Sequence, residues 1–242
     1  MSQMSQAEYF PFLELISNEI ENAFIIFHTH EALNRLALDD ADIFRVLNND
    51  ARFWLTYRST LLTSLFMTMS RLFDPAPDAM TVQRFVGATI ANPQLFSKEA
   101  HRRRKRAGGP EPPWLATYMT MVWEPKSSAD LKHLKKALNP HVTLFRSVYM
   151  PIRDKVYAHR LMSDERAGQE LFPNTNRQEL RDTLSFLRDL RITVRLLYDN
   201  GIEPVLGRQD SSDEANEIVE GVEKVLRRLI RRSDGHSPFP ET

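Results

Sequence analysis

The chain has 242 residues, equal numbers of basic (Lys, Arg) and acidic (Asp, Glu) side chains, and no cysteine. This length allows one large domain or two small ones, and a net charge of zero favours no class of partner through bulk electrostatics. The lack of cysteine excludes disulfides and thiolate metal sites and suits a reducing compartment.

Targeting signals and sheet patterns are also missing from the sequence. The N-terminus has no basic region followed by an apolar core, so we expect no signal peptide, and no apolar run approaches the ~18 residues of a membrane span. With eight glycines and no alternating Val, Ile and Thr runs, the sequence argues against sheet. We therefore expect an all-α, cytoplasmic protein.

The first third of the chain predicts three helices. Residues 7–37 carry apolar side chains at helical spacing, and Asp39 and Asp40 suit the N-terminus of a second helix. The strongest apolar helix is expected over residues 51–73. Its broad stripe predicts a central place in a bundle. The stripe consists of Trp54, Leu61, Leu65, Met69 and Leu72, widened by Leu62, Phe66 and Phe73.

Two shorter helices are expected over residues 81–91 and 93–106, and the second ends in a basic run followed by Gly-Gly-Pro. One interpretation of this run is a solvated helix end, because cations in the last turn complement the helix dipole. The other is a patch for the phosphate backbone of RNA, because clustered cations gain from counterion release. The run consists of Arg102, Arg103, Arg104, Lys105 and Arg106.

Capping signals organise the remaining helices. Residues 114–123 predict a short apolar helix, and Ser127 with Asp130 predicts the start of a helix that runs to Leu138. Pro140 is expected to begin the next helix. Thr175 with Gln178, and Ser211 with Glu214, predict the starts of two last helices, the first ending at Asn200–Gly201. Their expected core residues are Leu180, Leu184, Leu187, Leu190, Val194 and Leu197, then Ile218, Val222, Val225 and Leu229.

One helical segment, about residues 141–162, places two ionisable side chains at the borders of its apolar face. At about 100° per residue, one narrow apolar stripe is bordered by His159 on one side and Arg153 on the other. Ionisable side chains usually face solvent, so two at the border of an apolar face are presented to whatever that face packs against. The stripe consists of Phe145, Tyr149, Ile152 and Val156.

On a straight helix Arg153 and His159 do not touch. They are six residues apart, about 9 Å along the axis and about 120° around it. A working site therefore needs a distorted helix, a long reach of the guanidinium, or a second copy of the helix. Pro151 disturbs the helical hydrogen bonding, and a two-fold interface would bring two such pairs together.

Two stretches give the chain a resemblance to the HEPN superfamily, and within it to the abortive-infection, AbiU-type proteins. Arg153-Asp-Lys-Val-Tyr-Ala-His159 fits the pattern of an Arg, a polar residue, and a His after four to six intervening residues. The helix that contains Phe53-Trp54 and ends in Ser70-Arg-Leu-Phe-Asp74 resembles the long helix before the motif helix. With the helix order, the similarity covers roughly residues 10–200.

The resemblance implies an antiparallel helical bundle with extra short helices and a C-terminal amphipathic helix. It also implies a homodimer whose motif helices form one cleft, and a metal-independent endoribonuclease acting as a toxin or in phage defence. Arg153 and His159 would be the catalytic pair, and Asp154 would orient one of them. Lys155 would add weakly to RNA binding. We expect RNA as substrate, no metal or other cofactor, and an antitoxin or regulatory protein as a further partner.

These residue types suit RNA cleavage. Ribose supplies its own nucleophile, the 2′-OH, so the reaction needs proton transfer, which His performs near neutral pH, and a cation for the phosphate. One turnover needs both a base and an acid, and a two-fold site supplies two histidines. The alternatives are a catalytically silent RNA-binding bundle and a protein-interaction module of antitoxin or sensor type, in which Arg153 and His159 are packed or ion-paired residues.

The expected domain organisation has three parts: a HEPN-like domain over residues 7–200, a C-terminal helix over 208–234 packed on or extending it, and a disordered tail over 235–242.

Overall fold

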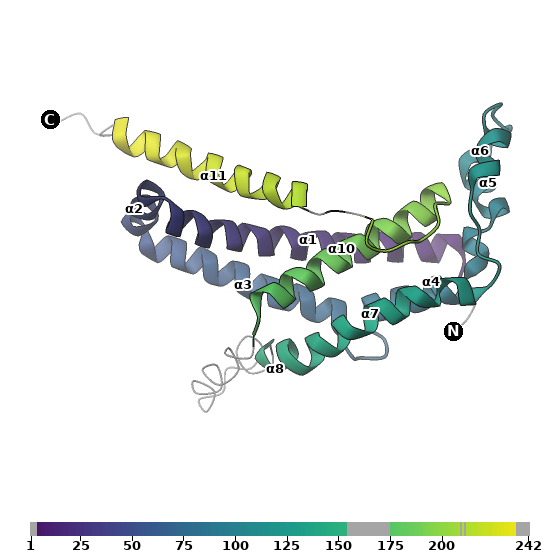
Figure 1. Cartoon of the computed structure of the whole chain (residues 1–242), viewed down its shortest axis with the longest axis horizontal. Helices are drawn as coiled ribbons and strands as arrows, with labels where there is room; N and C mark the ends of the chain where they lie inside the picture. The colour runs from purple at the N-terminus through teal and green to yellow at the C-terminus, as the bar shows by residue number, and fades with distance from the viewer. Residues whose placement is uncertain (1–3, 154–174, 209, 211, 236–242) are drawn as a thin grey trace.

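The structure is a computed structural model that describes residues 4–153, 175–208, 210 and 212–235. In these ranges every regular element is a helix, which confirms the predicted all-α bundle (Figure 1). The α-helices are α1 (Gln6–Asp39), α2 (Ala41–Asn49), α3 (Ala51–Phe73), α4 (Val82–Ala91), α5 (Lys98–Arg106), α6 (Leu115–Met121), α7 (Lys132–Leu144), α8 (Met150–Ile152), α10 (Arg177–Asn200) and α11 (Ser212–Gly235).

Helix α1 is the axis of the bundle. It contacts α3, α10 and α11, and α3 returns antiparallel beside it after the short α2 (Figure 1). The turn into α2 follows the predicted capping: the Asp40 side chain accepts hydrogen bonds from the backbone N–H groups of Asp42 and Ile43, at 2.9 and 3.0 Å. The predicted boundaries of these three helices hold to within a few residues because apolar spacing and caps agree.

The main core lies between α1, the second half of α3, α4, α7 and α10. The predicted core residues of α10 are all buried there, from Leu180 at 9 % exposure to Val194 and Leu197 at 0 %. Helix α10 ends at Gly201, whose φ of +61° suits glycine, as predicted from Asn200–Gly201. A Cβ at Gly201 would lie 2.5 Å from Cγ1 of Val122, so α6 and the end of α10 approach closely.

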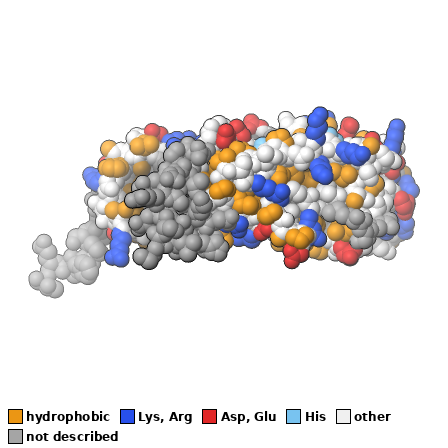
Figure 2. All heavy atoms as spheres, turned by 90° about the horizontal axis from the view of Figure 1, so that it is seen from below, with side chains coloured by type: hydrophobic (Ala, Val, Ile, Leu, Met, Phe, Trp, Pro, Cys, Tyr) orange, Lys and Arg blue, Asp and Glu red, His pale blue; other side chains and the backbone are white. Residues whose placement is uncertain are grey.

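The predicted stripe of helix α3 lies in the main core in its second half, and Trp54 and Leu61 of the first half pack against a second core, although other side chains of that half are exposed. The buried residues run from Leu65 to Phe73. Phe53 and Leu55 are 61 % and 62 % exposed. The nine residues of α2 turn the chain at one end of the bundle, so α1 and α2 flank the beginning of α3 there. Hydrophobic and basic side chains lie side by side on the surface of this end (Figure 2).

Several predicted boundaries are wrong by a turn. Residues 93–106 divide into a 3-10 turn (Pro93–Phe96) and α5, since Ser97 caps α5. Pro140 lies inside α7; it is exposed, as is Lys136, whose carbonyl loses its helical donor, so water can replace that bond. The predicted Ser127–Asp130 capping box is confirmed; it opens a 3-10 turn (Ser128–Leu131) that leads into α7, which ends at Leu144 and not at Leu138.

The predicted N-cap of α10 is also wrong by one residue. Asn176, rather than Thr175, caps α10, because its side chain accepts from the N–H of Gln178 at 2.8 Å.

Helix α11 packs on α1 and α2 through a small second core. Of the predicted apolar face, Ile218 and Val222 pack against the cores. Farther along the helix the prediction is wrong by one residue, because Leu226 and Ile230 are buried, whereas Val225 is 53 % and Leu229 36 % exposed. Apolar residues form two adjacent columns on this helix, and sequence alone does not show which column meets the bundle. The predicted cap Ser211 and, apart from Gly235, the predicted tail at 235–242 lie outside the described residues.

Within the described ranges, no helix has the length and apolar character needed to cross a membrane.

Candidate functional site

The segment expected to carry the motif is a distorted helix. Helix α7 continues into a π-helical turn, Phe145–Tyr149, in which the N–H of Met150 donates to the carbonyl of Phe145, and α8 follows. Pro151 lacks an N–H, and its ring would crowd the carbonyl four residues earlier in a regular α-helix. The wider turn relieves this conflict, and such turns are frequent at functional sites.

The predicted apolar stripe holds as far as the structure describes it. Phe145, Tyr149 and Ile152 are each at most 2 % exposed, and the ring of Phe145 stacks on Phe73 of α3 at 4.8 Å between centroids. The Tyr149 hydroxyl donates to the backbone carbonyl of Asn176 at 2.9 Å. This bond ties the motif helix to the beginning of α10. Val156 lies outside the described residues.

Of the four motif residues predicted for the site, the structure places Arg153. It follows α8 directly, is partly buried, and its Nε is shielded from solvent. Asp154, Lys155 and His159 lie outside the described residues. The pairing of Arg153 with His159 and the contribution of Asp154 therefore stay predictions.

A large open groove borders the end of the motif helix. Its volume is about 1110 Å³, and its walls come from α1, the middle of α3, the beginnings of α10 and α11, and Phe44 of α2. Tyr149, four residues before Arg153, lines the groove, although Arg153 itself does not. The apolar floor consists of Phe27, Leu62, Leu65, Phe66 and Leu180.

Arginines and one partly buried acid set most of the charge of this groove. Arg177 and Arg181 of α10 reach Glu31 of α1 with N–O distances of 3.3 and 3.2 Å. Burial alone would raise the pKa of Glu31, but a hydrogen bond with His30 and the two arginine charges outweigh it and lower that pKa. Glu31 is thus ionised and fully engaged.

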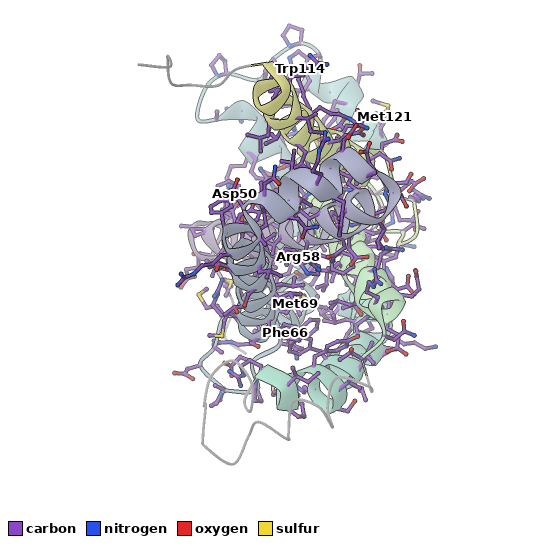
Figure 3. The ribbon with its side chains drawn as sticks, turned by 90° about the vertical axis from the view of Figure 1, so that its left-hand side faces the viewer. Asp50, Arg58, Phe66, Met69, Trp114 and Met121 are labelled. Atoms are coloured by element: carbon purple, nitrogen blue, oxygen red, sulfur yellow. The ribbon has the colours of Figure 1, made fainter. Side chains whose placement is uncertain are left out.

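Two further arginines line the groove without such a partner. Arg35 of α1 is exposed, and Arg58 of α3 is partly buried with an Nε that has no hydrogen-bond partner. Neither forms an ion pair with any residue of the described ranges. Figure 3 shows Arg58 on α3, between Asp50 at the exposed beginning and Phe66 in the core.

A buried histidine, His28, also lines the groove. Its ring lies 4.3 Å from that of Phe24, centroid to centroid, and burial, reinforced by the charge of Arg181, lowers the pKa of His28 to about 4. His28 is therefore neutral at pH 7. Between residues 4 and 235, the described side chains contain no group of three His, Asp or Glu placed to bind a metal.

The basic run on α5 lies at the right-hand end of the bundle in Figure 1, away from α8, which lies below the middle of the bundle. Arg104 donates to the carbonyls of Leu95 and Tyr198, at 2.8 and 2.7 Å, and to Nδ1 of His101 at 3.0 Å. Its guanidinium also covers the Tyr198 ring. Arg104 thus stabilises the fold by joining α5 to Leu95 and to the end of α10.

The neighbours of Arg104 are also engaged locally, with one exception. Arg102 lies 3.8 Å from Glu111, Lys105 reaches Asn200, and Arg106 donates to the carbonyl of Gly109. Arg103 is exposed and forms no bond within the described ranges. The structure does not bring the predicted α5 patch and the motif helix together.

The groove arginines were missed because they come from separate helices. One local signal existed: Arg177 and Arg181 lie at the beginning of α10, where the helix dipole disfavours cations. Arg58 likewise interrupts a strongly apolar stretch. Such misplaced cations indicate a partner or a function.

Comparison with known families places most of these elements in one unit. A family model of HEPN type described as AbiU2 (HEPN_AbiU2) matches residues 12–222, from the first turns of α1 into α11. No curated protein and no solved structure gives a significant match.

Proposed function

The chain belongs to the AbiU2 family of abortive-infection HEPN domains, and on this premise we propose that it is a metal-independent endoribonuclease of phage defence or of a toxin–antitoxin pair. The proposal rests on the position of Arg153 at the end of a π-distorted helix, next to an arginine-lined groove. A planar guanidinium there suits a phosphate, both in the ground state and as charge develops.

In the proposed reaction, the ribose 2′-OH attacks the adjacent phosphorus and the 5′-oxygen leaves. The products are a 2′,3′-cyclic phosphate and a 5′-hydroxyl. His159 would take the 2′-OH proton, the same residue of a second copy would protonate the leaving oxygen, and Arg153 would hold the phosphate. Asp154 would orient Arg153 or His159. Two copies of the motif helix would thus form one composite site in a homodimer.

The test incubates purified protein with mixed RNA in excess EDTA, beside Arg153→Ala and His159→Ala variants. We expect cleavage by the wild type, and a loss in each variant of about 100-fold or more. Equal activity in all three would remove the catalytic assignment. Cleavage that depends on added divalent metal would remove the metal-independent mechanism.

The composite site makes a separate prediction about mass in solution. Light scattering should show a dimer at the concentrations at which RNA is cut. An active, strict monomer would contradict the composite site and leave the family assignment unaffected.

A second candidate, a protein-interaction module of antitoxin or sensor type, is favoured by the exposed apolar beginning of α3. Phe53, Leu55 and Tyr57 are all more than one third exposed there, as is Phe44 of α2. Apolar surfaces of this kind often mark protein contacts. Co-purification of a second protein, together with no affinity for RNA, would support this candidate over the ribonuclease.

A further inference from the structure

We propose that the groove between α1, α3, α10 and α11 binds single-stranded RNA and delivers it to the motif helix. This inference rests on the proposed ribonuclease function and adds to it a binding site made of residues outside the motif. The groove and the motif helix meet at Tyr149, whose hydroxyl bonds to Asn176 at the beginning of α10. A strand lying in the groove would therefore reach the end of the motif helix.

Unsatisfied positive charge is the first argument. Of the groove arginines, Arg177 and Arg181 share Glu31, whereas Arg35 and Arg58 have no ion-pair partner in the described ranges. The Nε of Arg58 is shielded from solvent and makes no hydrogen bond. A cation held at a groove wall without a carboxylate indicates an anionic ligand, and RNA phosphates have the charge and geometry for a guanidinium.

Apolar and aromatic surface is the second argument. Phe44 is 55 % exposed and lines the groove, so its ring is available to stack on a base, whereas Phe27 and Phe66 of the floor are buried and supply apolar contact only at their edges. A groove with cations for the backbone and aromatic faces for the bases is the arrangement by which proteins bind single strands. A duplex offers its phosphates but hides the base faces, so the groove suits a single strand better.

The size of the groove agrees with this ligand. A volume of about 1110 Å³ is larger than a site for one small molecule needs, and the groove is open to solvent. Glu31 does not oppose the ligand, because Arg177 and Arg181 already neutralise it. Asp210 is the other acid of the lining, so the arginines give the groove a net positive charge.

The experiment measures binding of a short fluorescent oligouridine to the His159→Ala protein, which prevents cleavage during the titration. The charge variant is Arg35→Ala with Arg58→Ala, and its matched control is Arg52→Ala with Arg228→Ala, two exposed arginines outside the groove and outside the α5 basic run. We expect the groove variant to raise Kd about tenfold and to reduce the salt slope by about 1.4, the value for two phosphate contacts on a single strand. The control should match the parent.

Base stacking is tested separately with Phe44→Ala, against Phe53→Ala as an equally exposed aromatic control that does not line the groove. Phe44→Ala should raise Kd about tenfold and Phe53→Ala should leave it unchanged. Circular dichroism and urea unfolding should show that all four variants are folded.

The outcomes separate this inference from the proposed function. If the His159→Ala parent binds RNA and the groove variants bind equally well, or the Arg52 and Arg228 control weakens binding instead, the groove assignment is wrong and the ribonuclease proposal stands. If the His159→Ala parent does not bind RNA and the wild type does not cut RNA, both proposals are wrong. An acidic peptide that binds the parent but not the groove variants, while RNA affinity is unchanged, would assign the groove to a protein partner and overturn the inference.

Discussion

The two arginine-rich regions of this protein differ in whether their arginines are bonded to the rest of the fold. On α5 the basic residues are consecutive in the sequence, yet Arg104 is bonded to two backbone carbonyls and a histidine. In the groove the arginines come from three helices, and Arg35 and Arg58 have no partner in the described ranges. A run of charge along a chain is therefore a poor guide to where free charge lies on the surface.

The largest expected effect is on the fold, at Arg104. Arg104→Ala removes three hydrogen bonds and leaves the carbonyls of Leu95 and Tyr198 without this donor, so we expect a loss of about 3 kcal/mol in the free energy of unfolding. Urea unfolding measures it. Arg103→Ala, one residue earlier and exposed, should stay within about 0.5 kcal/mol of wild type. Similar losses in both variants would contradict the contrast between the two regions.

A pH titration extends the comparison to one buried histidine in each region. Burial lowers the pKa of His28 and of His101 to about 4, helped by Arg181 and Arg104 respectively. Both values lie below that of the unfolded chain, about 6.5, so between these limits the unfolded chain binds protons that the folded chain does not. The free energy of unfolding should therefore fall as pH decreases from about 6.5 to about 4, by about 2 kcal/mol per histidine.

Urea unfolding across this pH range checks the effect, and His101→Gln separates the two regions. The glutamine oxygen can still accept from Arg104, and it does not titrate, so this variant should lose less stability in acid than wild type. Stability that stays constant from about pH 7 to about pH 4 would show that neither histidine is held neutral by the fold.

The smallest expected effect is at Arg58. Its Nε has no hydrogen-bond partner, so Arg58→Met, which keeps the apolar stem against the groove wall, should change the free energy of unfolding by less than about 0.5 kcal/mol. Thermal and urea unfolding measure it. A loss near that of Arg104→Ala would mean that Arg58, too, serves the fold and is not reserved for a ligand.

The sequence predicted local structure better than surfaces. Helix boundaries followed from caps such as Asp40 and Gly201, whose signals lie within a few residues of the structure they determine. The exposed beginning of α3 could not be predicted, because apolar periodicity shows that Phe53 and Leu65 are hydrophobic and not which neighbours cover them. For the same reason, Val225 of α11 was expected to be buried, whereas its neighbour Leu226 is the buried residue.

For the candidate site too, the sequence predicted the residues of one short segment and not the residues that packing brings together. Arg153 and the buried stripe from Phe145 to Ile152 were predicted because they lie on one short segment. The groove was not, because Arg35, Arg58 and Arg177 are brought together by the packing of three helices that the chain visits at widely separated positions. Pro151 indicated distortion, but a proline alone does not specify whether a helix bends, ends or widens.

The widened turn from Phe145 to Tyr149 changes the phase of everything after it. A π-helical turn absorbs one residue more than an α-turn, so side chains beyond it lag by about 100° behind a regular helix of the same sequence. A helical wheel drawn straight through this segment therefore aims Arg153 in the wrong direction. Deleting a single residue of the turn would convert it to a regular α-turn and leave Arg153 on the face that it now occupies, because the turn holds one residue more than an α-helix needs.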